Sequence, residues 1–340
     1  MKYVGIDLPK KRITVCVVDQ DRTKITTRQF ACVAVDRIVA FFRGLGPFQA
    51  VVEATARSEW LLTRIEPLAQ RVVLAHPGKL RVIAESTRKS DKVDARVPAE
   101  FLALDMIPQA YRPTPRQREH RALVRHRQFL QKERTQLRNT VRRIVSDYNA
   151  DRRDRFTAAG PEHLAGRSLD ASDRFIVQQL LEQLEDQEAQ LAALGKQLRA
   201  FAGAGSEAEQ RHRRVLRGVT GVGEVTTEVV LAELGDATRF RATKQAVAYA
   251  GLAPGRRESA GKARDLGITK RGSGRWRWVL VEASWQLVRR SASWREVYGR
   301  LKQRRGRRRA IGAVARRLLG VLVALLRRGQ EYREPAVPPL

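Results

Sequence analysis

The chain opens with the stretch Lys2-Tyr3-Val4-Gly5-Ile6-Asp7, an apolar run that ends in a carboxylate. Two further runs of strand-forming residues follow at 12–18 and 24–31, with turn-forming residues between them. Both connections are too short for the crossover helix that parallel strands would need. The sequence therefore predicts that these three strands form an antiparallel meander.

Helical and extended patterns then alternate as far as residue 110. In order, they are a helix at 35–43, a strand at 50–53, a helix at 58–69 and a strand at 71–75. Elements in this order form a sheet with helices packed against it. We therefore expect an α/β or α+β domain over residues 1–112.

Four acidic residues mark the candidate chemistry of this domain. Asp7 and Glu53 each end an apolar strand, and Asp91 and Asp94 lie three apart, on one face of any helix that begins there. Carboxylates at the ends of buried strands can converge on one point, and several together hold divalent metal. Helix capping by Asp91 and Asp94, and an arginine partner for Glu53, are the structural alternatives. The four acids together favour a metal site.

Positive charge dominates the 340-residue chain. Lys and Arg number 66 against 36 Asp and Glu, which gives a formal net charge of +30. Such an excess attracts polyanions, and nucleic acid is the most common of them. A basic helix and a later arginine run are the candidate contacts to a nucleic-acid backbone. Their residues are Arg121, Arg125, Arg134, Arg138, Arg142, Arg143, Arg304, Arg305, Arg307, Arg308 and Arg309.

The sequence carries no sign of secretion or of a membrane anchor. Cys16 and Cys32 both lie in apolar stretches, as expected of buried, reduced thiols. We recognise no signal peptide, and two arginines interrupt the most apolar late run, 310–326, which we expect to be an amphipathic helix. We therefore expect a cytoplasmic protein that has no membrane span.

Residues 113–203 are expected to be helical throughout. Leucines and one isoleucine recur every seven residues from Leu123 to Ile144, and apolar residues recur in steps of three and four from Val177 to Phe201. Gln187 is the polar exception in the second segment. The pattern predicts a coiled coil, and an antiparallel hairpin within one chain fits the sequence as well as a dimer does.

Residues 204–334 form a third expected region, in which two glycines stand out. Gly221 and Gly223 lie in a short turn between two helical segments. Backbone amides in such a turn can hold a phosphate, although an ordinary helical hairpin has the same sequence pattern. In a chain this basic we favour the interpretation as a nucleic-acid contact.

A serine in the same region is a candidate nucleophile. Ser259 lies in the loop-like stretch 255–262, among cations that include Lys262, with Lys270 and Arg271 further along the chain. A serine hydroxyl needs activation to attack, and nearby cations would stabilise charge that develops on a phosphate. Ser273 lies in a similar stretch and is the rival candidate.

These motifs resemble those of the transposases of insertion-sequence family one-ten, the RNA-guided bridge recombinases, over nearly the whole chain. The matching segments are Gly5-Ile6-Asp7, Val52-Glu53-Ala54-Thr55, residues 89–95, residues 240–254, Ser259-Ala260-Gly261-Lys262 and residues 267–272. Around the serine the family usually has Ser-Ser-Gly-Gly-Lys, from which Glu258 and Ala260 depart.

The resemblance implies the fold and the site residues. It implies a RuvC-like domain of the ribonuclease H type at 1–112, a helical coiled-coil region at 113–203, and a mainly α-helical transposase domain at 204–334. The residues that match the family's metal ligands for Mg²⁺ or Mn²⁺ are Asp7, Glu53, Asp91 and Asp94.

The resemblance also implies a mechanism and partners. Ser259 matches the family's nucleophile, which attacks DNA and becomes covalently linked to it. The implied partners are donor and target DNA, a noncoding bridge RNA that pairs with both, and further copies of the chain, as a dimer that assembles into a tetramer.

Two other functions fit parts of the sequence. A RuvC-like nuclease would resolve branched DNA with metal-activated water, but it would leave Ser259 without a role. A nucleic-acid-binding protein without catalytic activity would explain the charge but not the four acids. A covalent protein–DNA adduct distinguishes the first alternative, and metal-dependent cleavage distinguishes the second.

Overall fold

The computed structural model describes residues 1–55, 58–83, 91–151, 156, 169–259 and 262–334. For residues 81–83, 91–94, 256, 257, 259 and 262–264 it describes the backbone alone. Internal contacts divide the chain into an N-terminal unit, Met1–Arg112, and a C-terminal unit, Pro113–Leu340.

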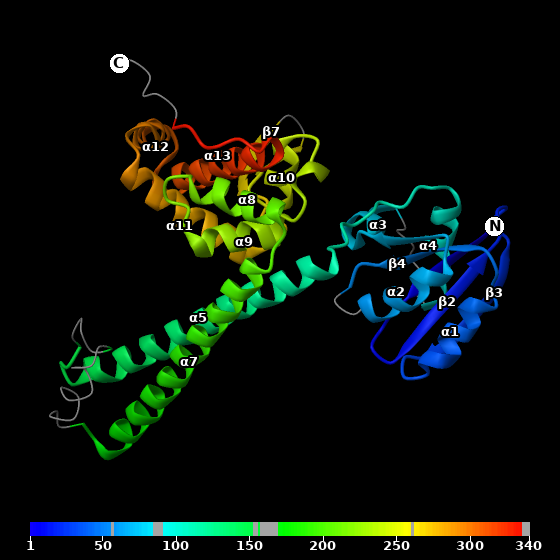
Figure 1. Cartoon of the computed structure of the whole chain (residues 1–340), viewed down its shortest axis with the longest axis horizontal. Helices are drawn as coiled ribbons and strands as arrows, with labels where there is room; N and C mark the ends of the chain where they lie inside the picture. Colours follow the sequence, from blue (N-terminus) through cyan, green and yellow to red (C-terminus); the bar gives the residue numbers. More distant parts are fainter. Residues whose placement is uncertain (56–57, 84–90, 152–155, 157–168, 260–261, 335–340) are drawn as a thin grey trace. The chain divides into compact units, whose positions relative to one another are not determined.

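The N-terminal unit contains a five-stranded sheet with the strand order β3-β2-β1-β4-β5. Strands β1, β2 and β3 are antiparallel neighbours, whereas β4 runs parallel to both β1 and β5. The elements are β1 (Lys2–Asp7), β2 (Arg12–Val18), β3 (Lys24–Ala31), α1 (Val35–Arg43), β4 (Phe48–Glu53), α2 (Glu59–Ile65), η1 (Glu66–Leu68), β5 (Arg71–Ala75), α3 (Pro77–Ile83) and α4 (Asp91–Ala103) (Figure 1).

The expected meander and mixed α/β character of this unit are confirmed. Two boundaries differ from the prediction. Strand β4 begins two residues earlier, at Phe48, which is fully buried and so extends the apolar run. The predicted helix 58–69 ends as the short 3₁₀ segment η1, because Pro67 removes a backbone donor.

Alternate residues of the central strands face opposite sides of the sheet. On one side, Ile6 and Val52 belong to a buried cluster with Phe42 of α1. On the other side, Val51 belongs to a cluster with Leu102 of α4. Helices therefore cover both faces, and α4 lies on the face that Val51 occupies.

The C-terminal unit begins with two long helices, α5 (Pro115–Asp147) and α7 (Ala171–Gly203), which lie side by side (Figure 1). They are antiparallel, since Arg116 near the start of α5 donates to the carbonyl of Phe201, and Tyr148 just after α5 donates to Asp173 near the start of α7. Within one chain the structure is thus a helical hairpin; coiled-coil packing in the strict sense stays a prediction.

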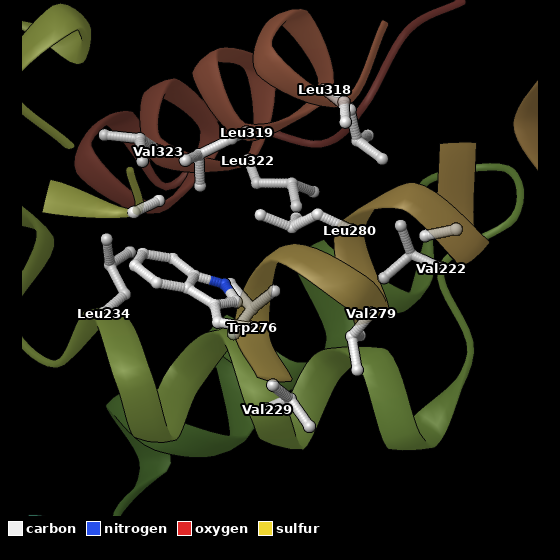
Figure 2. Close-up of a cluster of buried hydrophobic side chains, with 14 of the residues drawn as sticks. Val222, Val229, Leu234, Trp276, Val279, Leu280, Leu318, Leu319, Leu322 and Val323 are labelled. Carbon is white, nitrogen blue, oxygen red and sulfur yellow. The ribbon is translucent and has the colours of Figure 1, made fainter. Parts of the chain in front are cut away.

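The remaining elements are a helical bundle built around α13 and a two-stranded β-hairpin of β6 and β7. They are α8 (Glu207–Arg217), α9 (Glu224–Leu234), η2 (Ala237–Arg239), α10 (Thr243–Tyr249), β6 (Pro254–Ser259), β7 (Lys262–Ile268), α11 (Gly274–Arg290), α12 (Ala292–Arg305) and α13 (Arg307–Arg328). Figure 2 shows Leu319 and Leu322 of α13 facing Trp276 and Leu280 of α11, all almost completely buried. Among the described residues, no helix is long and apolar enough to cross a membrane.

The prediction that the stretch around Ser259 is a loop is wrong, because most of it forms a β-hairpin. Residues 254–259 and 262–268 pair as the antiparallel strands β6 and β7. The two stretches contain two glycines, a proline and an aspartate, which are depleted in strands, so cross-strand pairing rather than local propensity forms the hairpin.

A buried ion network joins α5, α8 and α9. Arg213 and Glu228 are 4% and 5% exposed, and the guanidinium donates to both carboxylate oxygens, over 3.0 and 3.2 Å. His120 Nε2 lies 2.9 Å from the same carboxylate. The network links the helical hairpin to the bundle.

Replacing Glu228 by Gln is expected to lower the free energy of unfolding by about 3 kcal/mol, because it leaves Arg213 buried without its main counter-charge. Burial alone raises the pKa of Glu228, but contacts with His120 and Arg213 outweigh it and hold the pKa below the ordinary 4.5. A carboxylate with a depressed pKa stabilises the fold above its unfolded pKa, and this contribution is lost as the pH falls through the folded pKa.

Urea unfolding of wild type and Glu228→Gln at pH 7 and at steps below pH 4.5 measures both effects. The difference in stability between the two proteins should be full at pH 7 and should shrink as the pH falls. A difference that stays constant down to the lowest pH would contradict this account.

Candidate metal and strand-cleavage site

Asp7 and Glu53 lie beside each other at the carboxyl ends of two parallel strands. Ile6 of β1 is the register partner of Val52 of β4, so the next position along each strand brings Asp7 next to Glu53. Both residues are half-buried. The structure therefore brings together two of the four predicted metal ligands.

Both carboxylates project onto the sheet face that α4 covers. Asp7 follows Gly5 by two residues and Glu53 follows Val51 by two, so strand alternation places each pair on one face. A Cβ atom built on Gly5 would lie 1.9 Å from the carbonyl oxygen of Ala95. Helix α4 thus contacts β1 backbone to backbone, which only glycine permits.

Asp91 and Asp94 are the first and fourth residues of α4. Asp94 directly precedes Ala95, which contacts β1 two residues before Asp7, so the backbone of α4 approaches the pair of strand carboxylates. The side chains of Asp91 and Asp94 lie outside the described residues. Among the described side chains, no group of three His, Cys, Asp or Glu is arranged to hold a metal.

Ser259 is the last residue of β6, and its backbone pairs with that of Lys262 across the end of the hairpin. The side chains of both residues lie outside the described part of the chain. The rival serine, Ser273, has a clear structural role, since its hydroxyl accepts a hydrogen bond from the Trp276 amide and caps α11.

Three arginines predicted to bind nucleic acid make contacts within the protein. Arg121 donates two hydrogen bonds, of 2.7 and 3.0 Å, to carbonyl oxygens in the last turn of α9. Arg125 donates twice, over 2.9 Å each time, to the carboxylate of Glu233, and Arg138 pairs with Glu188 at 2.6 Å. These contacts hold α5 against α9 and α7.

Other predicted contacts lie at the surface. The residues that are exposed are Arg142, Arg143, Lys270, Arg271, Arg304, Arg305, Arg307, Arg308 and Arg309. Arg134 is half-buried, and its Nε has no hydrogen-bond partner among the residues that the structure describes. The five arginines from 304 to 309 flank Gly306, which separates α12 from α13 (Figure 1).

The two turn glycines differ in their surroundings. Gly221 has a φ of +83°, and a Cβ there would lie 2.7 Å from the amide nitrogen of Leu287, so close packing on α11 requires glycine. Gly223 precedes α9 as its N-cap, and open space surrounds it. Phosphate binding by this turn stays a prediction.

Thr14, which no sequence motif marks, is 1% exposed and is the register partner of Asp7 on β2. The sequence does show a polar residue within the apolar stretch Ile13–Val18. Its position opposite Asp7 depends on strand register, which the sequence pattern alone did not supply.

An α/β domain with carboxylates at the ends of adjacent parallel strands, in a chain with a basic helical unit, is typical of enzymes that cut DNA strands. A DEDD transposase model of IS110 elements matches residues 4–150, and a model described as "Transposase IS116/IS110/IS902 family" matches residues 213–299. The chain is a DNA transposase, and it belongs to the IS110 family.

Full-length relatives agree with this assignment. The chain is 26% identical to the transposase for insertion sequence element IS1111A of Coxiella burnetii, over 98% of this chain and 92% of that protein. It is 28% identical to a protein of Pseudomonas aeruginosa named "Probable family 20 transposase", over 98% of this chain and 99% of the relative.

Proposed function

We propose that this transposase excises and inserts its own element by serine-mediated strand exchange, with a divalent metal and a bridge RNA. The observation that supports it most directly is the register that sets Asp7 beside Glu53, under the helix that carries Asp91 and Asp94. We assign a ribonuclease H-like fold to the N-terminal unit for the same reason.

The donor set fits a hard divalent cation. Asp7 and Glu53 supply carboxylate oxygens from rigid strand ends, and Asp91 and Asp94 would supply two more from α4. Such all-oxygen sets suit Mg²⁺ or Mn²⁺ rather than softer metals. When bound, the ion would stabilise negative charge on the phosphate and on the leaving oxygen.

Ser259 is the nucleophile in this proposal. Its Oγ forms a bond to the phosphorus of DNA while the bond from phosphorus to the leaving deoxyribose oxygen breaks. The hydroxyl proton passes to solvent, and the leaving oxygen takes up a proton in turn. Attack by a second DNA end on the phosphoserine reverses the chemistry and releases the serine. Lys262 and the neighbouring arginines stabilise the charge on the phosphate.

The remaining assignments concern regions and partners. The hairpin of α5 and α7 makes up the coiled-coil region 113–203, and 204–334 is the transposase domain. Exposed arginines such as Arg304 and Arg308 contact the backbone of DNA or of the bridge RNA. Dimers that assemble into tetramers bring the metal site of one subunit to the serine of another, in the cytoplasm.

Recombination should depend on RNA. Purified protein is combined with donor DNA, target DNA, Mg²⁺ and the noncoding RNA of the element, and recombined product is measured. We expect product only with the RNA, and we expect DNA binding to weaken steeply with salt. If the protein recombines the same sites after complete RNase treatment, the guide role is wrong, although the nuclease chemistry would stand.

A further inference from the structure

A row of polar residues crosses four strands of the N-terminal sheet. Asp7 is the register partner of Thr14, Thr14 is the partner of Gln29, and Glu53 lies next to Asp7 on the other side. Directly paired residues share one face of a sheet, so the four side chains share the face of α4. On β2 the next two residues on this face are Cys16 and Val18, and both are completely buried.

The Thr14 hydroxyl is in an unusual position for a polar group. It is 1% exposed, within a strand whose next four residues are all completely buried and lack hydroxyls. Valine has the same shape and would avoid the cost of burying a hydroxyl. A buried hydroxyl at this position therefore calls for partners on both its acceptor and its donor side.

The acceptor side is occupied. Gln29 Nε2 donates to Thr14 Oγ1 over 3.2 Å. Within the described part of the chain, the hydroxyl donates to no group. Because the lone pair toward β3 is used by Gln29, the proton is free to point toward β1, where the paired Asp7 lies. Paired residues have Cβ atoms about 5 Å apart, so a hydroxyl and a carboxylate that make no direct hydrogen bond are within reach of one bridging water.

We propose that Thr14 is a positioning residue for Asp7, and that Gln29 fixes the direction of its hydroxyl. By donating its proton through one water toward the Asp7 carboxylate, Thr14 orients that carboxylate for binding the metal. Groups that orient a metal ligand in this way typically change metal affinity about 10–100-fold when removed. The inference rests on the proposed metal site, and it adds a residue that touches neither metal nor DNA.

The test measures Mn²⁺ binding to the full-length protein. The electron paramagnetic resonance signal of free Mn²⁺ reports how much of the ion stays unbound. Thr14→Val should raise the dissociation constant at least about tenfold while leaving the melting temperature unchanged or higher. Thr14→Ser keeps the hydroxyl and should retain wild-type affinity. Gln29→Leu, on the exposed edge strand, should also weaken Mn²⁺ binding. This variant replaces Thr14→Val in the test if Thr14→Val does not fold.

Thr27→Val is the matched control. Thr27 is paired with Cys16, one step along the same face, and its hydroxyl contacts Cys16 Sγ at 3.7 Å rather than a carboxylate. The control should bind Mn²⁺ like wild type.

The outcomes separate this inference from the proposed function. Binding that is lost in Asp7→Asn but unchanged in Thr14→Val overturns the role of Thr14 and leaves the metal site intact. If wild type binds no Mn²⁺, or if Asp7→Asn binds it as tightly as wild type does, the proposed metal site is wrong, and this inference fails with it. Weakened binding in Thr27→Val to the same degree as in Thr14→Val would show a general effect on the sheet and also overturns the inference.

Discussion

Ser259→Ala should abolish the covalent link between protein and DNA, and with it all recombination. The substitution removes the only atom that would form the phosphoserine bond, and no other group stands in its place. The residue ends β6, where its backbone pairs with that of Lys262, and alanine can keep this backbone pairing. Stability should therefore change little, and the loss should be one of chemistry alone.

The measurement is a denaturing gel of protein incubated with end-labelled DNA, followed by mapping of the linked peptide. Ser273→Ala is the matched control: it should retain the adduct and should lose about 1 kcal/mol of stability, because it removes the cap of α11. An adduct that survives Ser259→Ala, or that maps to Ser273, would show that the nucleophile is another serine. Active wild type without any adduct would favour a nuclease that uses metal-activated water.

Replacing any one of the four acids by alanine should abolish element excision in cells while the protein still folds. Clustered carboxylates repel each other, so removal of one loses metal affinity without opening a cavity in the apolar core. For Asp7 and Glu53 the half-buried position at a strand end supports this expectation. Excision should fall further in these four variants than in a variant with an alanine substitution elsewhere on the sheet.

The control for the carboxylates is Asp36→Ala, on an exposed position of α1, the helix that covers the opposite face of the sheet. Excision and melting temperature should both stay at wild-type levels. Wild-type excision by any two of Asp7→Ala, Glu53→Ala, Asp91→Ala and Asp94→Ala would rule out the shared metal site.

The N-terminal sheet was the most predictable part of the fold. Its strands combine dense apolar runs with short turns, so local pattern and tertiary pairing point the same way. The β6–β7 hairpin was missed because residues 254–259 and 262–268 carry little strand signal, and pairing between the two stretches decides their conformation. The choice between a hairpin and a dimer for α5 and α7 depended on contacts such as that between Arg116 and Phe201, far apart in the sequence.

The residues of the candidate site could be predicted from the sequence, but the contacts that surround them could not. Strand ends drew attention to Asp7 and Glu53, but charge alone could not separate arginines that face solvent from those that hold helices together. Arg121 and Arg125 have the same sequence signal as Arg142, yet they bind carbonyl and carboxylate oxygens of α9. Exposure and partners are properties of packing, and a pattern of charges along one helix does not contain them.

The contact between Gly5 and Ala95 fixes the distance between helix α4 and strand β1. With the two backbones touching, the separation of helix α4 from strand β1 is the smallest that atoms allow, and nothing at position 5 can adjust it. Even a methyl group there would lift the helix and carry Asp91 and Asp94 away from Asp7. The spacing of the proposed ligands from two different elements, on which any shared ion would depend, is thereby governed by a residue that has no side chain of its own.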